Sequence, residues 1–192
     1  MVAYTVPGMK PGDAEKTTAL LQDRLNSLND LSLTLKHVHW NVVGPNFIAV
    51  HTMIDPQVDA VRLMADDVAE RIAALGGSPV GTPGALVKQR DWDDYSIGRA
   101  DAIAHLGALD VVYTGILETN RAAIDKTEEL DLVTQDLLVG QTRQLEQFQW
   151  FIRAHLENAD GTLSTSGAGT EGGAAKRAQD AKGNQDARSK RH

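Results

Sequence analysis

The chain has 192 residues, a length typical of a single domain, and 42% of them are hydrophobic, enough to form a core. It contains no cysteine, which excludes disulfides, thiolate zinc sites, iron–sulfur clusters and cysteine nucleophiles, so any metal must be held by nitrogen and oxygen atoms. The net charge of −7 is uneven: residues 161–192 carry six basic and three acidic groups and residues 1–160 carry 13 and 23, which indicates an acidic body with a basic tail.

A first helix is expected after an N-terminal extension, residues 1–12. Asp13 is suited to cap this helix, and apolar residues then recur at spacings of three and four up to about Val42. The spacing places five leucines on one stripe that faces a core: Leu21, Leu25, Leu28, Leu31 and Leu35.

A second helix is expected from Phe47 to about Leu75. Residues 44–46, Gly-Pro-Asn, break the first helix, and Asn46 is suited to cap the second. Two glycines follow Leu75 and end this helix, and Pro56 within it predicts a kink.

Two further helices are expected, from about Ser96 to Lys126 and from about Leu132 to Asn158, because apolar residues again recur at helical spacing. Residues 76–94 are rich in Gly and Pro and form a long connection with room for one short helical turn. Residues 13–158 therefore predict an all-α fold, a ferritin-like four-helix bundle with a long connection between the second and third helices.

Residues 159–192 are expected to form a disordered, basic C-terminal tail. Leu163 is their only large apolar residue, so the segment can bury too little surface to offset its ordering entropy. At the other end, the first residues lack a basic start followed by an apolar segment, and no run of 18 apolar residues occurs anywhere. A cytoplasmic protein that does not enter a membrane is expected.

Four potential metal ligands are concentrated in residues 36–72: His39, His51, Asp66 and Glu70. Asp66 and Glu70 are four residues apart, so they lie on one helix face and can bind the same cation. His39 continues the leucine stripe. Each residue alone is more often structural, as a hydrogen-bonded core histidine or a solvated helix acid, but the four together favour a metal site.

Helix geometry indicates that one chain cannot complete this site. His51 and Asp66 are 15 residues apart on one expected helix, which separates them by about 22 Å along its axis. If two copies of the helix pair antiparallel, His51 of one chain meets Asp66 and Glu70 of the other, with the two-fold axis near residues 59–60. The sequence also lacks the Glu-x-x-His pairs of di-iron sites within one bundle.

The stretch HWNVVGPNFIAVHTMID, with DDVAERI and later FQWFIRAHLE, resembles the Dps family, the DNA-binding proteins from starved cells, over roughly residues 10–158. The resemblance implies that His39 and His51 of one subunit and Asp66 and Glu70 of its two-fold partner bind iron. It also implies a tryptophan beside the iron, here Trp40, that donates an electron and quenches radicals. Asp55 matches a family acid near a second, weaker iron position, whereas Thr52 stands where relatives often have an acid.

The resemblance further implies a dodecameric shell of two-fold dimers. Such a shell oxidises Fe(II) with hydrogen peroxide or dioxygen, stores ferric mineral and protects DNA from oxidative damage. Zn²⁺ suits the same ligands and is expected to compete with iron and inhibit, since it has no redox chemistry. Three acids between the third and fourth helices fit either an acidic channel for iron or a solvated loop: Glu128, Glu129 and Asp131.

The alternative function is non-specific binding and compaction of DNA by residues 176–191, which would make the protein nucleoid-associated. Their basic groups would contact phosphates without reading sequence, and many copies on one shell would multiply the effect. A solvated terminus that keeps the shell soluble explains the same composition. The third candidate is a helical bundle that assembles but catalyses no reaction. The basic residues are Lys176, Arg177, Lys182, Arg188, Lys190 and Arg191.

Overall fold

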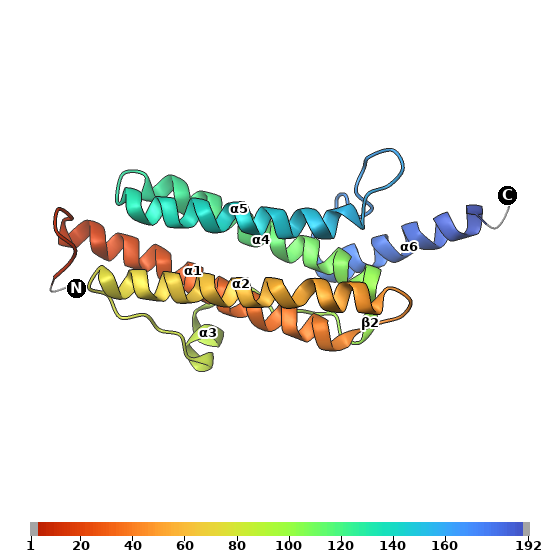
Figure 1. The fold of residues 1–192 in the computed structure, drawn as a ribbon, viewed down its shortest axis with the longest axis horizontal. Helices are drawn as coiled ribbons and strands as arrows, with labels where there is room; N and C mark the ends of the chain where they lie inside the picture. Colours follow the sequence, from red (N-terminus) through yellow and green to blue (C-terminus); the bar gives the residue numbers. More distant parts are fainter. Residues whose placement is uncertain (1–3, 190–192) are drawn as a thin grey trace.

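The computed structural model describes residues 4–189, apart from the side chains of four residues near the C-terminal end. Two long helix pairs form its body (Figure 1): α1 runs antiparallel to α2, and α4 runs antiparallel to α5. The elements are α1 (Pro11–Asn41), β1 (Val42–Val43), α2 (Phe47–Ala74), α3 (Pro83–Gln89), β2 (Ala100–Asp101), α4 (Ala102–Thr127), α5 (Leu132–Ala154) and α6 (Glu171–Ser189). This is the expected all-α, ferritin-like arrangement.

The predicted leucine stripe of α1 lies in the core. Leu21, Leu31 and Leu35 are fully buried, and valines of α2 such as Val61 and Val68 are buried with them. Burying a leucine or valine side chain stabilises a fold by about 1.5 to 3 kcal/mol, so this seam holds α1 against α2. The core also contains one fully buried tyrosine, Tyr113, whose hydroxyl donates a 2.7 Å hydrogen bond to Gln57.

Three predicted helix ends differ from the structure. α1 begins at Pro11, because a proline at the first helical position lacks only an N–H that would have no partner there. α4 begins at Ala102 and not near Ser96, because Ala100 and Asp101 pair in parallel with β1 and the Asp101 carboxylate then caps the helix through the amide of Ala104. α5 ends at Ala154, before the predicted Asn158.

The other predicted features of these helices agree more closely with the structure. Asn46 occupies the N-cap position of α2, but its side chain makes no capping hydrogen bond, and the helix runs through Pro56 without ending. The short helical turn expected in the long connection is α3. None of the described helices, taken over residues 4–189, is long and apolar enough to cross a membrane.

The C-terminal segment is not the disordered tail that its composition predicts, because α6 packs along α4. Small residues make this packing close: Ala174 and Ala178 are buried, and a Cβ added to Gly107 would lie 2.8 Å from the Ala174 carbonyl oxygen. Helix backbones that approach this closely gain van der Waals contacts without large apolar side chains. A prediction based on the number of large apolar residues therefore missed this helix. Lys190 and Arg191 lie outside the described residues.

The segment that leads into α6 is fixed by hydrogen bonds. The hydroxyl of Thr165 donates to the buried Asp110 carboxylate at 2.9 Å, and Arg177 donates to the Ser166 carbonyl at 2.8 Å. Glu171, the first residue of α6, accepts hydrogen bonds from the amide and the hydroxyl of Ser96 at 2.7 and 2.8 Å. The tail is therefore attached both to α4 and to the connection that precedes it.

Candidate metal centre

Two of the predicted ligands, His39 and His51, lie against each other at one end of the bundle. His39 is in the last turn of α1 and His51 is near the start of α2, and the short turn between these helices brings the two together. Their rings are stacked, with 3.6 Å between centroids and 23° between planes. His39 is buried and His51 is half-buried.

Hydrogen bonds fix the tautomer of both neutral rings. Nδ1 of His39 lies 3.0 Å from the His51 carbonyl oxygen, and Nδ1 of His51 lies 2.9 Å from the His39 carbonyl oxygen. A carbonyl oxygen only accepts, so each Nδ1 carries the proton and donates it. In the neutral rings, each Nε2 therefore keeps a free lone pair, which is the state that binds a metal ion.

Asp55 completes a cluster of three possible ligands, one turn beyond His51 along α2. Atoms of His39, His51 and Asp55 that can bind metal all lie within 4.8 Å of one another, and over residues 4–189 this is the only group of three or more such side chains. One oxygen of Asp55 accepts a 2.8 Å hydrogen bond from Nζ of Lys36 and lies 3.2 Å from Nδ1 of His39. The Lys36 hydrogen bond lowers the pKa of Asp55 below its ordinary value, which keeps the carboxylate charged.

The other two predicted ligands, Asp66 and Glu70, are not brought to this cluster by their own chain. α2 is one helix from Phe47 to Ala74, so the 15 residues between His51 and Asp66 again correspond to about 22 Å. Both acids are exposed, and at helical spacing they continue a surface stripe with Leu63, which is 66% exposed. The single chain therefore keeps the four predicted ligands in two separate places, the histidines where α1 meets α2 and the two acids farther along α2.

Trp40 follows His39 directly and is 72% exposed. It is one of several large apolar side chains that α1 and α2 leave uncovered, together with Leu33 at 60% and Ile48 at 62%. Uncovered apolar side chains near an incomplete ligand set are typical of a surface that is buried by another subunit.

Among the three acids that fit either an iron channel or a solvated loop, Asp131 has a structural role. Its carboxylate caps α5 through the amide of Thr134 and forms an ion pair with Arg71 at 2.5 Å, with only 12% of its side chain exposed. Burial opposes ionisation, but the hydrogen bonds from Thr134 and Arg71 prevail and lower the pKa of Asp131. Glu128 and Glu129 are exposed.

Two features of the centre were not predicted from the sequence. The reciprocal bonds between the histidines depend on the path of the 42–46 turn, which local patterns do not define. Lys36 did carry a signal, since it lies three residues before His39 and thus on the same helix face, where it could have been expected to pair with an acid of the centre.

Comparisons with known proteins identify close relatives. The family model of the ferritin-like domain matches residues 18–162. The chain is 59% identical, over 93% of its length and 98% of the relative's, to the DNA protection during starvation protein of Mycolicibacterium smegmatis. Among solved structures, Mycobacterium smegmatis Dps superposes with a TM-score of 0.86 at 59% identity, covering 88% of this chain and 97% of that one. DpsA14 from Streptomyces coelicolor superposes with a TM-score of 0.83 at 70% identity, covering 84% and 96%.

Proposed function

Because this chain belongs to the Dps proteins of the ferritin-like family, we propose that it is a cytoplasmic ferroxidase that oxidises Fe(II) between two subunits and stores the ferric product in a shell. The observation that carries this proposal is the stacked pair of His39 and His51, each held with Nδ1 protonated and Nε2 free. Neutral imidazole together with carboxylate suits ferrous iron.

The substrate iron is bound by His39 and His51 of one subunit and by Asp66 and Glu70 of the partner subunit. The unbroken α2 supports this assignment, because two copies paired antiparallel around residues 59–60 would set His51 opposite both acids twice in each dimer. The same pairing would cover the exposed side chains of Ile48 and Leu63. Six such dimers then form the dodecamer.

The protein's part in the reaction is to hold Fe(II) with few ligands, so that an oxidant has an open coordination position. Each hydrogen peroxide takes one electron from each of two Fe(II) ions and becomes water, while hydrolysis of the Fe(III) product releases protons. Asp55, already charged and next to His39, supplies an oxygen for a second iron position. Trp40, adjacent in sequence to His39, donates an electron to stray radicals.

The experiment that tests the shared site is complementation between two inactive variants, His51→Ala and Glu70→Ala. Each alone should lose rapid Fe(II) oxidation. If the ligands come from two subunits, refolding an equal mixture should recover about a quarter of the wild-type rate, because half of the dimers are mixed and each has one intact site of two. Asp67→Ala, an exposed neighbour on α2, is the matched control and should keep full activity. No recovery in the mixture would reject the shared site.

A second candidate function is non-specific DNA binding by the C-terminal segment. The specific observation in its favour is that α6 presents Lys176, 78% exposed in its side chain, on a helix attached to the outside of α4. Lys176 forms only an exposed ion pair with Asp180, at 3.3 Å, which contributes little and can yield to a phosphate. A gel-shift comparison of the full chain with a version ending at residue 160 tests this function, since equal binding would exclude the segment.

A further inference from the structure

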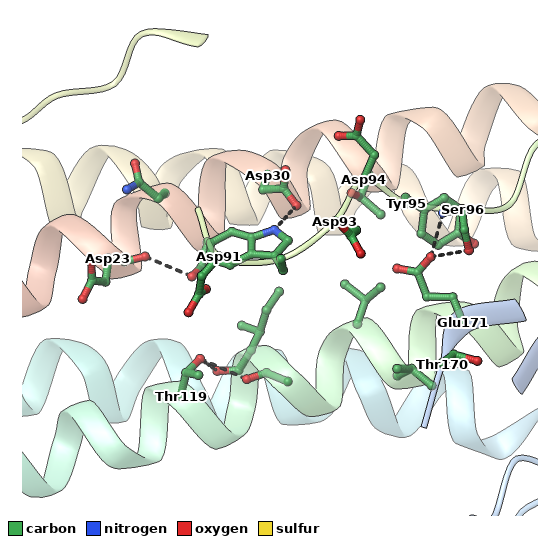
Figure 2. A pocket seen from close by; sticks show the side chains of 18 of the residues that line it. Asp23, Asp30, Asp91, Asp93, Asp94, Tyr95, Ser96, Thr119, Thr170 and Glu171 are labelled. Carbon is green, nitrogen blue, oxygen red and sulfur yellow. Dashed lines mark hydrogen bonds between the residues drawn. The ribbon is translucent and has the colours of Figure 1, made fainter. Parts of the chain in front are cut away.

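A cavity of about 720 Å³ lies outside the metal centre, between α1, the extended residues 91–96, α4 and residues 169–171 at the start of α6 (Figure 2). This volume is within the range of cavities that hold small organic ligands. We refer to it below as the α1–α4 groove. Nothing in the proposed ferroxidase reaction uses it.

The floor and one wall of the groove are apolar. Val112 and Ile116 of α4 line the floor, and the glycine between them, Gly115, has open space above it, with no atom within 4 Å of an added Cβ. Trp92 lines the wall and is held by a 2.9 Å hydrogen bond from its ring nitrogen to Asp30. An aliphatic chain could therefore lie along α4 without displacing a side chain.

The rim of the groove is strongly acidic. Six carboxylates line it, against one lining cation, Arg24, and the adjacent Arg90 pairs with two of the six, Asp30 and Asp94. Asp91 is attracted electrostatically to Arg24, and no hydrogen bond or ion pair joins Asp93 to the rest of the described chain. The net negative charge of the rim favours a cationic occupant. The six are Asp23, Asp30, Asp91, Asp93, Asp94 and Glu171.

The carboxylates are spread along the groove and do not converge on one point. Figure 2 shows Asp23 at one end and Glu171 at the other, with Asp91, Asp93 and Asp94 between them. No three of these acids come close enough to hold one metal ion, since the only such group in residues 4–189 is at the histidine pair. Spread charges above an apolar floor match a flexible chain that carries several ammonium groups separated by methylenes, and not a compact ion.

We propose that the α1–α4 groove binds an aliphatic polyamine, with its methylenes on Val112, Gly115 and Ile116 and its ammonium groups at Asp91, Asp93 and the ends of the groove. This site is independent of iron oxidation. The fraction of grooves that hold a polyamine should fall as salt concentration rises, because salt screens the attraction between the ammonium groups and the exposed carboxylates.

Isothermal titration of the assembled full-length protein with spermidine at low salt tests the proposal. Asp91→Asn with Asp93→Asn should weaken spermidine binding about tenfold or more, because charge-assisted hydrogen bonds are lost. Gly115→Leu, which fills the groove without changing its charge and improves helix propensity, should weaken binding by a similar factor. The matched control is Asp136→Asn with Glu157→Gln, two exposed acids outside the groove, and it should bind spermidine within about twofold of wild type.

Four outcomes would overturn the proposal. The first is an equal loss of affinity in the control, which would show diffuse attraction to an acidic protein. The second is that butylamine, with a single ammonium, binds as tightly as spermidine. The third is that the wild-type protein does not bind spermidine, and the fourth is that Gly115→Leu binds it unchanged. The Fe(II) oxidation rate should be unaltered in every variant, which confirms that each one folds and assembles.

Discussion

His39 and His51 each donate a ring N–H to the other's backbone carbonyl, at 3.0 and 2.9 Å, so that neither ring can turn without breaking the bond that it donates. The pair is therefore oriented before any metal arrives. A nitrogen-resolved NMR titration should show both rings in the Nδ1–H tautomer in the metal-free protein. Zn²⁺ should shift Nε2 of both residues, and observing the Nε2–H tautomer would contradict the assignment.

Lys36 should limit metal affinity at the centre. Its ammonium lies 2.8 Å from Asp55, where it occupies a carboxylate oxygen and repels a cation. Lys36→Met should increase Zn²⁺ affinity by about threefold to tenfold, measured by competition with a chelating dye. Lys88→Met, an exposed lysine on α3, is the control for loss of one positive charge. Weaker Zn²⁺ binding in Lys36→Met would mean that Lys36 positions Asp55 for the metal.

Trp40 should protect the protein against radicals and should not be needed to bind metal. Its ring is 72% exposed and has no metal-binding nitrogen. Trp40→Phe should bind Zn²⁺ as wild type does but release more hydroxyl radical when Fe(II) and hydrogen peroxide react, detected by spin trapping. Trp150→Phe, at another exposed tryptophan (63%), is the matched control. Equal radical yields in both variants would remove Trp40 from the mechanism.

Two glycines of α4 should respond in opposite ways to alanine. A Cβ at Gly107 would lie 2.8 Å from the backbone of α6, so Gly107→Ala should destabilise the docked helix by about 1 to 3 kcal/mol. Gly115→Ala meets no atom within 4 Å and should stabilise the protein by up to about 1 kcal/mol through helix propensity. Hydrogen exchange over residues 171–189 should quicken only in Gly107→Ala; unchanged exchange there would mean that the contact contributes little.

Acid should weaken the ion pair between Arg71 of α2 and Asp131 at the N-cap of α5. The lowered pKa of Asp131 means that its contribution to stability is complete above the ordinary carboxyl pKa of about 3.9 and is lost as the pH falls through the lower native value. Asp131→Asn keeps the helix cap but loses the charge paired with Arg71. Its free energy of unfolding should therefore be about 1 to 2 kcal/mol below wild type at pH 7, with the difference vanishing under acid. Denaturant unfolding at fixed protein concentration measures this, with Asp136→Asn as control; a gap that persists at low pH would contradict it.

Structural features that depend on residues near in sequence could be predicted, and those that depend on contacts with backbone far away in sequence could not. The spacing of apolar residues placed α2 within one residue of its observed end, and Asn46 at its N-cap, because both follow from local helix rules. The start of α4 was predicted six residues early, because pairing with β1 extends the chain there. α6 was missed because Ala and Gly pack by close backbone approach, which apolar counting does not register.

The same distinction applies to the candidate site. Helix rise alone predicted that Asp66 and Glu70 lie far from the histidines of their own chain, and the unbroken α2 agrees. The reciprocal histidine bonds and the Lys36–Asp55 contact arise from how α1 and α2 meet, which the spacing of residues along one helix does not specify.

The short parallel pairing of Val42 with Ala100 joins the turn between the two histidines to the start of α4. This pairing holds the backbone of the turn in place in the folded chain. The conformational entropy of ordering the imidazoles is therefore lost when the chain folds and not when iron binds. If the site is shared as proposed, each folded subunit contributes a pair of imidazoles that is already ordered, and active sites should form at the rate at which subunits associate.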